Sequence, residues 1–260
     1  MSANHKVFWI TGASSGIGEA LAYEASANGA TVILSARRKE ELERVAGGCS
    51  GETKVVPLDL TDQESLKKAA EEVLSSYEVD VLINNGGISM RGRAHETDFS
   101  VDRRLMEIDY FGHVALTKLV LPQMIKRGKG HLVAISSVVG RFGFPMRSAY
   151  SAAKHALNGF FETVGLELYD KGVNVTIVNP GRIKTQISLN ALNNDGSTYG
   201  KMDKGQEEGI PADVCAKKIL KAVARGKREI NIGNKEVLLL QIRRFFPSLF
   251  FKIARKVSPT

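Results

Sequence analysis

The sequence predicts an α/β fold, built as a doubly wound, mostly parallel sheet with helices on both faces. Short apolar runs alternate with helical patterns along most of the 260 residues, which is the order of βαβ units. The apolar runs are rich in β-branched residues, as strands buried on both faces should be. No internal repeat, low-complexity tract or linker divides the chain, so we expect a single domain over residues 1–260.

The first half of the chain supplies four of the expected strands. Apolar, β-branched runs predict strands at residues 7–11, 31–35, 54–57 and 81–84. Helical patterns between them predict helices at residues 17–28, 39–45 and 65–76. Parallel neighbours need crossover connections of this kind, so the alternation favours a parallel sheet.

The second half continues the alternation with longer helices. A long helical region is expected over residues 101–127, where Pro122 should bend or interrupt the helix because proline lacks the amide hydrogen. Strands at residues 132–136 and 174–178 flank a further helix, which holds Tyr150.

The positive charge is concentrated at the end of the chain. The net charge is +8, and residues 235–260 alone hold six Lys or Arg against one Glu, a net +5 that leaves +3 for the other 234 residues. A nearly balanced main body argues against a nucleic-acid partner. We see no secretory signal and no apolar run of the roughly 20 residues that a spanning helix needs, so we expect a cytoplasmic protein.

The cysteines and histidines indicate no metal site. Cys49 and Cys215 lie far apart in the sequence without metal-ligand spacing, which favours two reduced thiols. The five histidines show no ligand spacing with each other or with the cysteines. We therefore expect structural or surface histidines and no bound metal.

A glycine-rich turn, Thr11-Gly-Ala-Ser-Ser-Gly-Ile-Gly18, lies between the first expected strand and the first expected helix. Its glycines permit a close approach of backbone N–H groups to a pyrophosphate, and the helix N-terminus adds a favourable field. A purely structural turn is the alternative, but the flanking strand and helix favour nucleotide binding. The predicted binding residues are Gly12, Ser14, Ser15, Gly16, Ile17 and Gly18.

The end of the second expected strand indicates the type of dinucleotide. An acidic residue there would accept hydrogen bonds from the ribose hydroxyls and repel a 2′-phosphate, but this chain has Ala36-Arg37-Arg38. A guanidinium pairs with phosphate in bidentate fashion. We therefore expect NADP(H) to be preferred over NAD(H), the alternative being that both arginines only solvate the next helix.

Tyr150 and Lys154 are four residues apart, so on a helix they share a face about one turn apart. The Lys154 ammonium should then favour the phenolate and lower the pKa of Tyr150 from its unperturbed value of about 10. A tyrosine tuned in this way exchanges a proton with a substrate oxygen near neutral pH. The spacing alone occurs by chance on many helices, so this interpretation depends on the other motifs.

Together these motifs resemble the short-chain dehydrogenase/reductase (SDR) family. The glycine turn, Asn84-Asn85-Gly86-Gly87, Ser137…Tyr150-xxx-Lys154 and Asn179-Pro180-Gly181 follow the family's order within residues 6–233. The resemblance implies a Rossmann-type subunit that moves hydride between a nicotinamide cofactor and a carbonyl or alcohol. Tyr150 would be the catalytic acid or base, Lys154 would hold the nicotinamide ribose, and Ser137 would polarise the substrate oxygen.

The resemblance also implies the remaining cofactor contacts. These are Asp59 and Leu60 at the adenine, Asn85 and Gly86 along the adenosine half, and Pro180, Gly181, Ile183 and Thr185 at the nicotinamide amide.

The chain departs from the family's pattern in two places. Gly86-Gly87 replaces the usual Ala-Gly, which is a mild steric change. Asp109 stands where the family usually has an asparagine that supports a water relay to the lysine. A carboxylate cannot donate as the amide does, and if ionised it should hold Lys154 more firmly charged. We therefore expect an altered pH–rate profile.

Two segments fall outside the alternating pattern. Residues 186–210 are rich in Asn, Gly, Asp, Ser and Lys, and we expect them to form a flexible substrate lid. Residues 235–260 form a basic, apolar C-terminal element. One interpretation is a helix packed on its own chain or on a partner subunit, and the other is a peripheral contact with an anionic membrane.

We expect an NADP(H)-dependent oxidoreductase that acts on a small, apolar carbonyl or alcohol, since the lid contains Ile187, Leu189 and Leu192. One alternative is a 3-oxoacyl thioester reductase acting with acyl carrier protein, and another is a cofactor-sensing scaffold with little activity. The resemblance further implies a homodimer or homotetramer, because the family pairs its long helices.

Overall fold

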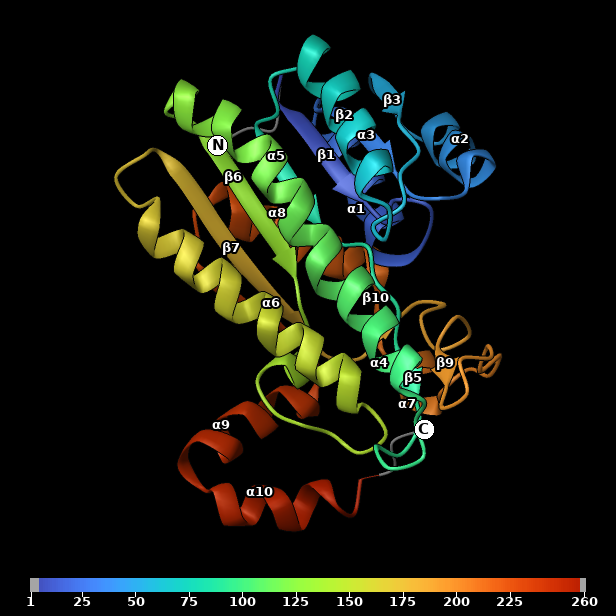
Figure 1. Ribbon diagram of the computed structural model, residues 1–260. Helices are drawn as coiled ribbons and strands as arrows, with labels where there is room; N and C mark the ends of the chain where they lie inside the picture. The colour runs from blue at the N-terminus through green and yellow to red at the C-terminus, as the bar shows by residue number, and fades with distance from the viewer. Residues whose placement is uncertain (1–4, 258–260) are drawn as a thin grey trace.

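The centre of the molecule is a seven-stranded sheet in the order β11-β7-β6-β4-β1-β2-β3, in which every neighbouring pair is parallel (Figure 1). The computed structural model describes residues 5–257, so residues 258–260 of the predicted C-terminal element lie outside the described range. The strands are β1 Val7–Thr11, β2 Thr31–Ser35, β3 Thr53–Val55, β4 Val81–Asn84, β6 Gly130–Ile135, β7 Val173–Pro180 and β11 Glu229–Ile232. The predicted α/β fold is confirmed, and β11 is a strand that the sequence did not predict.

Helices cover both faces of this sheet. One face carries α1 (Gly16–Ala27), α2 (Lys39–Gly47) and α8 (Ala212–Ala224), and the other carries α3 (Gln63–Ser76), α5 (Gly112–Arg127) and α6 (Ser148–Glu167). Successive strand residues point to opposite faces. Trp9 of β1 is therefore buried on the α3, α5 and α6 side, while Ile10 is buried on the α1, α2 and α8 side.

The predicted long helical region is confirmed over residues 99–127, and it is not interrupted at Pro122. Helix α4 (Phe99–Met106) passes into a π-helical segment at Glu107–Phe111 before α5 begins at Gly112. Pro122 lies inside α5, so the expected break there is wrong. The neighbouring Val120 and Met124 are completely buried, and this packing outweighs the cost of proline in a helix interior.

Residues 186–210, expected to be irregular, contain short ordered elements. Strand β9 (Leu192–Asn193) pairs with β5 (Met90–Arg91), and β10 (Ile210–Pro211) pairs with β8 (Ile183–Lys184). Helix α7 (Lys204–Glu207) lies between β9 and β10. The segment is therefore anchored to the body at both of its ends.

The C-terminal element forms two short helices, α9 (Leu238–Phe245) and α10 (Pro247–Ala254), at the foot of the molecule in Figure 1. They follow a 3-10 turn at Lys235–Val237 and pack on a second 3-10 turn, Val138–Gly140, and the loop after it. Within residues 5–257 no helix has the length and apolar character needed to cross a membrane.

Candidate active site

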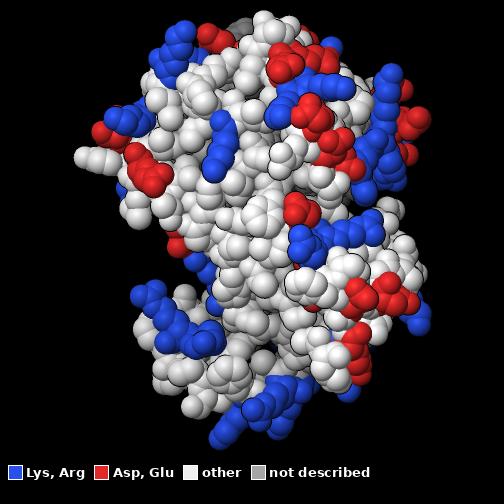
Figure 2. Space-filling view, in the orientation of Figure 1, with Lys and Arg blue, Asp and Glu red and all other residues white. Residues whose placement is uncertain are grey.

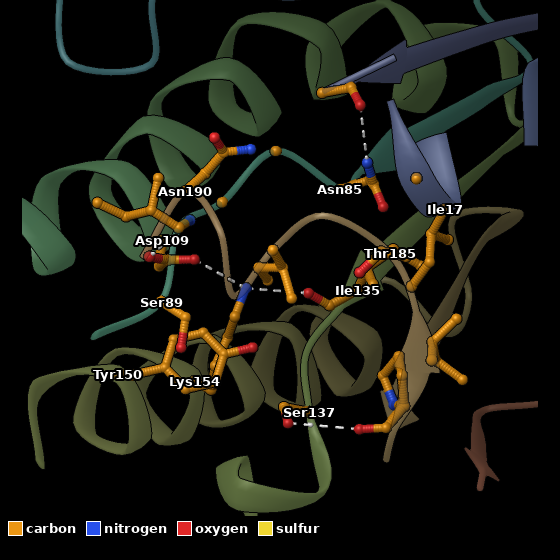
Figure 3. A pocket seen from close by; sticks show the side chains of 18 of the residues that line it. Ile17, Asn85, Ser89, Asp109, Ile135, Ser137, Tyr150, Lys154, Thr185 and Asn190 are labelled. Atoms are coloured by element: carbon orange, nitrogen blue, oxygen red, sulfur yellow. Dashed lines mark hydrogen bonds and ion pairs between the residues drawn. The ribbon is translucent and has the colours of Figure 1, made fainter. Parts of the chain in front are cut away.

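The candidate site is a cavity of about 590 Å³ beyond the carboxyl ends of the parallel strands. It lies where the strand order reverses between β1 and β4, which is the usual ligand position in a doubly wound sheet. Its walls include every predicted site residue except Gly18. Figure 3 shows how side chains from the ends of different strands and from α6 point into it.

The glycine turn is closely packed against the end of β4. Gly12 has a φ of +63°, and a Cβ there would lie 2.6 Å from the Gly86 Cα atom. A Cβ on Gly18 would meet the Gly12 carbonyl and the Asn85 amide, so Gly18 allows α1 to pack against the turn instead of lining the cavity. The Asn85 Nδ2 atom donates to the carbonyls of Thr11 (3.0 Å) and Gly12 (3.3 Å). This close packing fits a phosphate-binding cradle built from backbone.

Two guanidinium groups lie beside the glycine turn. Arg37 and Arg38 follow β2, are exposed to solvent and line the cavity. Arg38 Nη2 donates to the Ser14 hydroxyl at 3.4 Å, a contact that sequence reasoning did not anticipate. The Asp59 carboxylate accepts hydrogen bonds from the backbone N–H (2.9 Å) and the hydroxyl (2.8 Å) of Thr61.

Lys154 is held at the centre of the cavity by two oxygen atoms. Its Nζ atom lies 3.1 Å from Asp109 Oδ1 and donates to the Ile135 carbonyl at 3.2 Å (Figure 3). The same atom lies 5.7 Å from the centroid of the Tyr150 ring. Lys154 and Asp109 are both buried, so water hardly screens their interaction.

The pKa values of this cluster follow from burial and from Asp109. Burial raises the pKa of Tyr150, and the nearby Lys154 ammonium opposes this effect, but Asp109 adds to it. The lysine therefore acts in the predicted direction, yet the predicted net lowering is wrong because burial outweighs it. Burial disfavours the Lys154 ammonium, but Asp109 and Tyr150 outweigh this and raise the pKa of Lys154, as expected from a carboxylate at position 109.

Asp109, in the π-helical segment, packs closely against Gly87 and Ile88 in the loop after β4. Its Oδ2 atom accepts from the backbone N–H of Ile88 at 3.4 Å, and a Cβ on Gly87 would collide with Oδ1. A Cβ on Gly86 would lie 2.7 Å from Leu60 Cδ1. Leu60 thus occupies the space that the usual alanine methyl group would need, which explains why Gly-Gly can replace Ala-Gly.

Two adjacent serines at the end of β6 have different contacts. The Ser137 hydroxyl donates to the Pro180 carbonyl at 3.3 Å and accepts from the Val139 N–H at 3.3 Å. The Ser136 hydroxyl donates to the backbone carbonyl of Lys154 at 3.3 Å and thereby ties β6 to α6. Both serines line the cavity, but the Ser136 hydroxyl is tied to α6, so Ser137 stays the predicted substrate contact.

His113 contacts the segment that follows β4 and was not among the predicted site residues. It is completely buried, and burial lowers its pKa to about 3, so the ring is neutral. Nε2 lies 2.6 Å from the Gly86 carbonyl, so this nitrogen carries the hydrogen and donates it. The ring thereby holds the Gly86 carbonyl, just after β4, in place beside the cavity.

A buried ion cluster closes the other end of the cavity and was missed by sequence reasoning. Arg91 donates to Asp203 from Nε at 3.0 Å and from Nη2, and Arg147 Nη2 lies 3.3 Å from the same carboxylate oxygen. All three side chains are buried and line the cavity. Burial, with Arg91 adding to it, lowers the pKa of Arg147 to about 9. The cluster fastens the segment containing Asp203 to the body three residues before Tyr150.

Large apolar side chains also line the cavity. They include the side chains of Ile88, Phe142, Phe144, Ile187, Leu192 and Leu239. Two of the three apolar lid residues that we expected at the substrate are therefore present, whereas Leu189 does not line the cavity.

The chain is similar in sequence to proteins described as dehydrogenases or reductases. The profile of the family described as short chain dehydrogenase matches residues 6–195. A Drosophila melanogaster protein named Dehydrogenase/reductase SDR family protein 7-like is 45% identical over 260 residues, covering 96% of this chain and 80% of the fly protein. The Mus musculus protein named Dehydrogenase/reductase SDR family member 7B is 43% identical over 253 residues, covering 94% of this chain and 78% of the mouse protein.

Solved structures show the same arrangement of sheet and helices. A short-chain dehydrogenase from Streptomyces avermitilis has a TM-score of 0.80 at 34% identity and covers 96% of this chain and 98% of its own. A short chain dehydrogenase from Burkholderia cenocepacia in complex with NADP has a TM-score of 0.82 at 26% identity over 100% of both chains. One from Burkholderia phymatum in complex with NAD has a TM-score of 0.84 over 100% of this chain and 98% of its own, but at 21% identity it shows the fold alone. The sheet is a Rossmann fold, as the motifs predicted.

Proposed function

Because this chain belongs to the short-chain dehydrogenase/reductase family, we propose that it is an NADP(H)-dependent oxidoreductase acting on the carbonyl or alcohol of a small, apolar substrate. One observation carries the proposal: Ser137, Tyr150 and Lys154 converge in the same cavity as the glycine-rich turn. The large apolar side chains in the lining of that cavity favour an apolar substrate.

Each of the three polar side chains has a separate task at the substrate oxygen. Tyr150 donates its phenolic proton to this oxygen during reduction and takes a proton from it during oxidation. Lys154 stabilises the phenolate that forms in reduction, because its ammonium is held charged beside the ring by Asp109. Ser137 hydrogen-bonds the oxygen and stabilises developing charge. When bound, the nicotinamide supplies or accepts the hydride.

The residues around the glycine turn fit a dinucleotide with a 2′-phosphate. The close packing of Gly12 and Gly86 leaves backbone N–H groups available to a pyrophosphate, with the N-terminus of α1 behind them. Arg37 and Arg38 supply two cations where an NAD-binding site would need an acid. The Burkholderia cenocepacia relative in complex with NADP is consistent with this cofactor.

We further propose that the long helices mediate assembly into a homodimer or homotetramer. Figure 2 shows a broad uncharged strip on the face where Figure 1 places α5 and α6 side by side. Large apolar side chains of α4, the π-helical segment and the region of α6 are exposed, namely Phe99, Phe111, Leu166 and Tyr169. Light scattering coupled to gel filtration tests this, and a monomer at micromolar concentration would contradict it.

Cofactor titration followed by a carbonyl panel tests the central proposal. Calorimetry should show NADPH binding about tenfold or more tighter than NADH, since charge-assisted pairing with phosphate adds to affinity. Apolar ketones and aldehydes should then be reduced with NADPH. Cofactor binding without turnover on any carbonyl would favour a cofactor-sensing scaffold. Activity confined to a 3-oxoacyl thioester on acyl carrier protein would replace the proposed substrate class.

A further inference from the structure

Helices α9 and α10 bury one apolar face and expose another. On the inner face Phe250, 1% exposed, and Ala254 pack against Val138 and Phe142 beside the cavity. Five other large apolar side chains remain open to solvent, with exposed fractions of 47–63%: Leu238, Phe245, Phe246, Leu249 and Phe251. Single exposed apolar residues are ordinary, but a group this dense on one short helical hairpin, formed by α9 and α10, is typical of a docking surface.

Positive side chains accompany these aromatic rings. The Arg243 guanidinium lies 5.6 Å from the centroid of the Phe251 ring, and that of Arg244 lies 5.4 Å from the centroid of the Phe245 ring. Residues 235–257 contain six Lys or Arg and a single acid. Figure 2 accordingly shows blue side chains beside white ones over the hairpin, at the lower left and bottom of the molecule. The surface is complementary to a partner that is both anionic and apolar.

The one acid of this segment does not weaken that complementarity. Glu236 is turned toward the body of the protein, where its carboxylate accepts hydrogen bonds from the backbone N–H groups of Arg182 (2.8 Å) and Asn234 (3.1 Å). It also lines the cavity. The outward side of the hairpin therefore presents cations and aromatic rings without a neighbouring carboxylate from residues 235–257.

An anionic bilayer surface supplies both kinds of contact at once. Its headgroups attract Lys and Arg, and the boundary between headgroups and acyl chains accommodates aromatic rings. Each helix has only eight residues, which suits an element lying in the plane of the interface. Leu239 and Val257 of the same element line the cavity, so docking on this side would place the cavity next to the lipid.

We propose that α9 and α10 form a docking surface for an anionic phospholipid membrane. The exposed aromatic side chains enter the interfacial layer, and the Lys and Arg side chains contact the headgroups. The inner face stays packed on the loop after β6, so docking requires no unfolding of the hairpin. In this proposal the inner face of the C-terminal element packs on its own chain, and the outer face contacts an anionic membrane.

Co-sedimentation of the full chain with vesicles tests this proposal without reference to catalysis. The vesicles are phosphatidylcholine alone or phosphatidylcholine with about a third phosphatidylserine. We expect binding to the anionic vesicles that weakens with salt, and an about tenfold lower partition coefficient for Phe245→Ser/Phe246→Ser on both compositions. Lys252→Gln/Arg255→Gln/Lys256→Gln should remove mainly the part that depends on phosphatidylserine.

The matched control changes two exposed apolar residues that lie outside both the C-terminal helices and the proposed oligomer surface. Met202→Ser/Val214→Ser replaces side chains that are 39% and 37% exposed, and its vesicle binding should equal that of the wild type. Circular dichroism establishes that every variant is folded. Absence of binding by the wild type, or an equal loss in the control, would overturn the proposal. So would an unchanged partition of Phe245→Ser/Phe246→Ser with a lower oligomeric mass, because a second copy of the chain would then cover this face.

Discussion

The two halves of the cavity are built by different means. The half around the glycine turn is formed by backbone segments so close that Gly12 and Gly18 have no space for a Cβ. The opposite half is formed by side chains from distant parts of the chain, and a buried carboxylate, Asp203, joins Arg91 to Arg147. Under the proposed function, the first half would bind the dinucleotide and the second would contact the substrate.

This difference has consequences for substitution. In the half around the glycine turn, backbone N–H groups are the main predicted binding groups. Substitutions there should change the affinity for the cofactor and leave the affinity for the substrate unchanged. In the Asp203 half, substitutions should act on substrate affinity and on folding. Tyr150 and Asp109 lie between the two halves, and their substitution should act mainly on the chemical step, whereas Lys154 is also a predicted contact of the nicotinamide ribose.

Tyr150→Phe should give the largest effect and separate the two halves most clearly. Loss of the proton donor should lower kcat by about a thousandfold, whereas the Kd for NADPH, measured by calorimetry, should change less than about threefold. Tyr110→Phe removes the hydroxyl of a half-buried tyrosine that does not line the cavity, and its kcat should equal the wild-type value. A Tyr150→Phe variant that retains most of the wild-type kcat would contradict the assignment of Tyr150.

Asp203→Ala should damage the substrate half and leave the cofactor half intact. Two buried guanidinium groups would lose their shared carboxylate, which should lower the free energy of unfolding in urea by about 3 kcal/mol. The segment carrying Ile187 and Leu192 would also lose one of its attachments to the body, so KM for an apolar substrate should rise while the Kd for NADPH stays within about twofold. Asp195→Ala removes an exposed carboxylate from the same segment and should lower stability far less than Asp203→Ala. Equal effects of the two substitutions would show that the buried cluster is unimportant.

The same contrast explains how much could be predicted from the sequence. The glycine turn and the Tyr150–Lys154 pair are local patterns, so their positions on the fold follow from neighbouring residues. Arg91 and Asp203 are 112 residues apart, and in the sequence they look like any solvated charges. Strand β11 was missed because it is short and lies at the edge of the sheet with partly exposed residues. The π-helical segment at Glu107–Phe111 escaped prediction because it depends on tertiary packing, as does the uninterrupted helix at Pro122.

Arg37→Ser should change the affinity for the cofactor and leave the substrate half of the cavity unaffected. Without this guanidinium the Kd for NADPH should rise about tenfold, and further in Arg37→Ser/Arg38→Ser, because each charge-assisted contact to a phosphate contributes about 1.5 kcal/mol or more. The Kd for NADH and the KM for the carbonyl should stay within about twofold of the wild type. Lys39→Ser removes the next cation along the chain, which does not line the cavity, and should leave both Kd values unchanged. Equal weakening of NADPH and NADH binding would refute a role at the 2′-phosphate.

Asp109→Asn should have the smallest effect on the rate, and it tests the residues that lie between the two halves of the cavity. The Asp109 carboxylate adds one negative charge to a buried cluster and raises the pKa values of Tyr150 and Lys154. Removing that charge makes proton release from the tyrosine–lysine pair easier, so the apparent pKa of the pair should fall. Reduction needs the protonated tyrosine, and its loss of rate at high pH should therefore begin at lower pH.

In the direction of oxidation the sign of the rate change is reversed, because the phenolate is the active form. The rise of the oxidation rate with pH should then begin at lower pH in Asp109→Asn, by the same interval as the fall in reduction. Asp102→Asn makes the same change in α4, away from Lys154, and should reproduce the wild-type curves. Profiles of kcat against pH in both directions give the measurement. Superimposable curves for Asp109→Asn and the wild type would show that the carboxylate facing Lys154 has no part in setting the proton affinity of Tyr150.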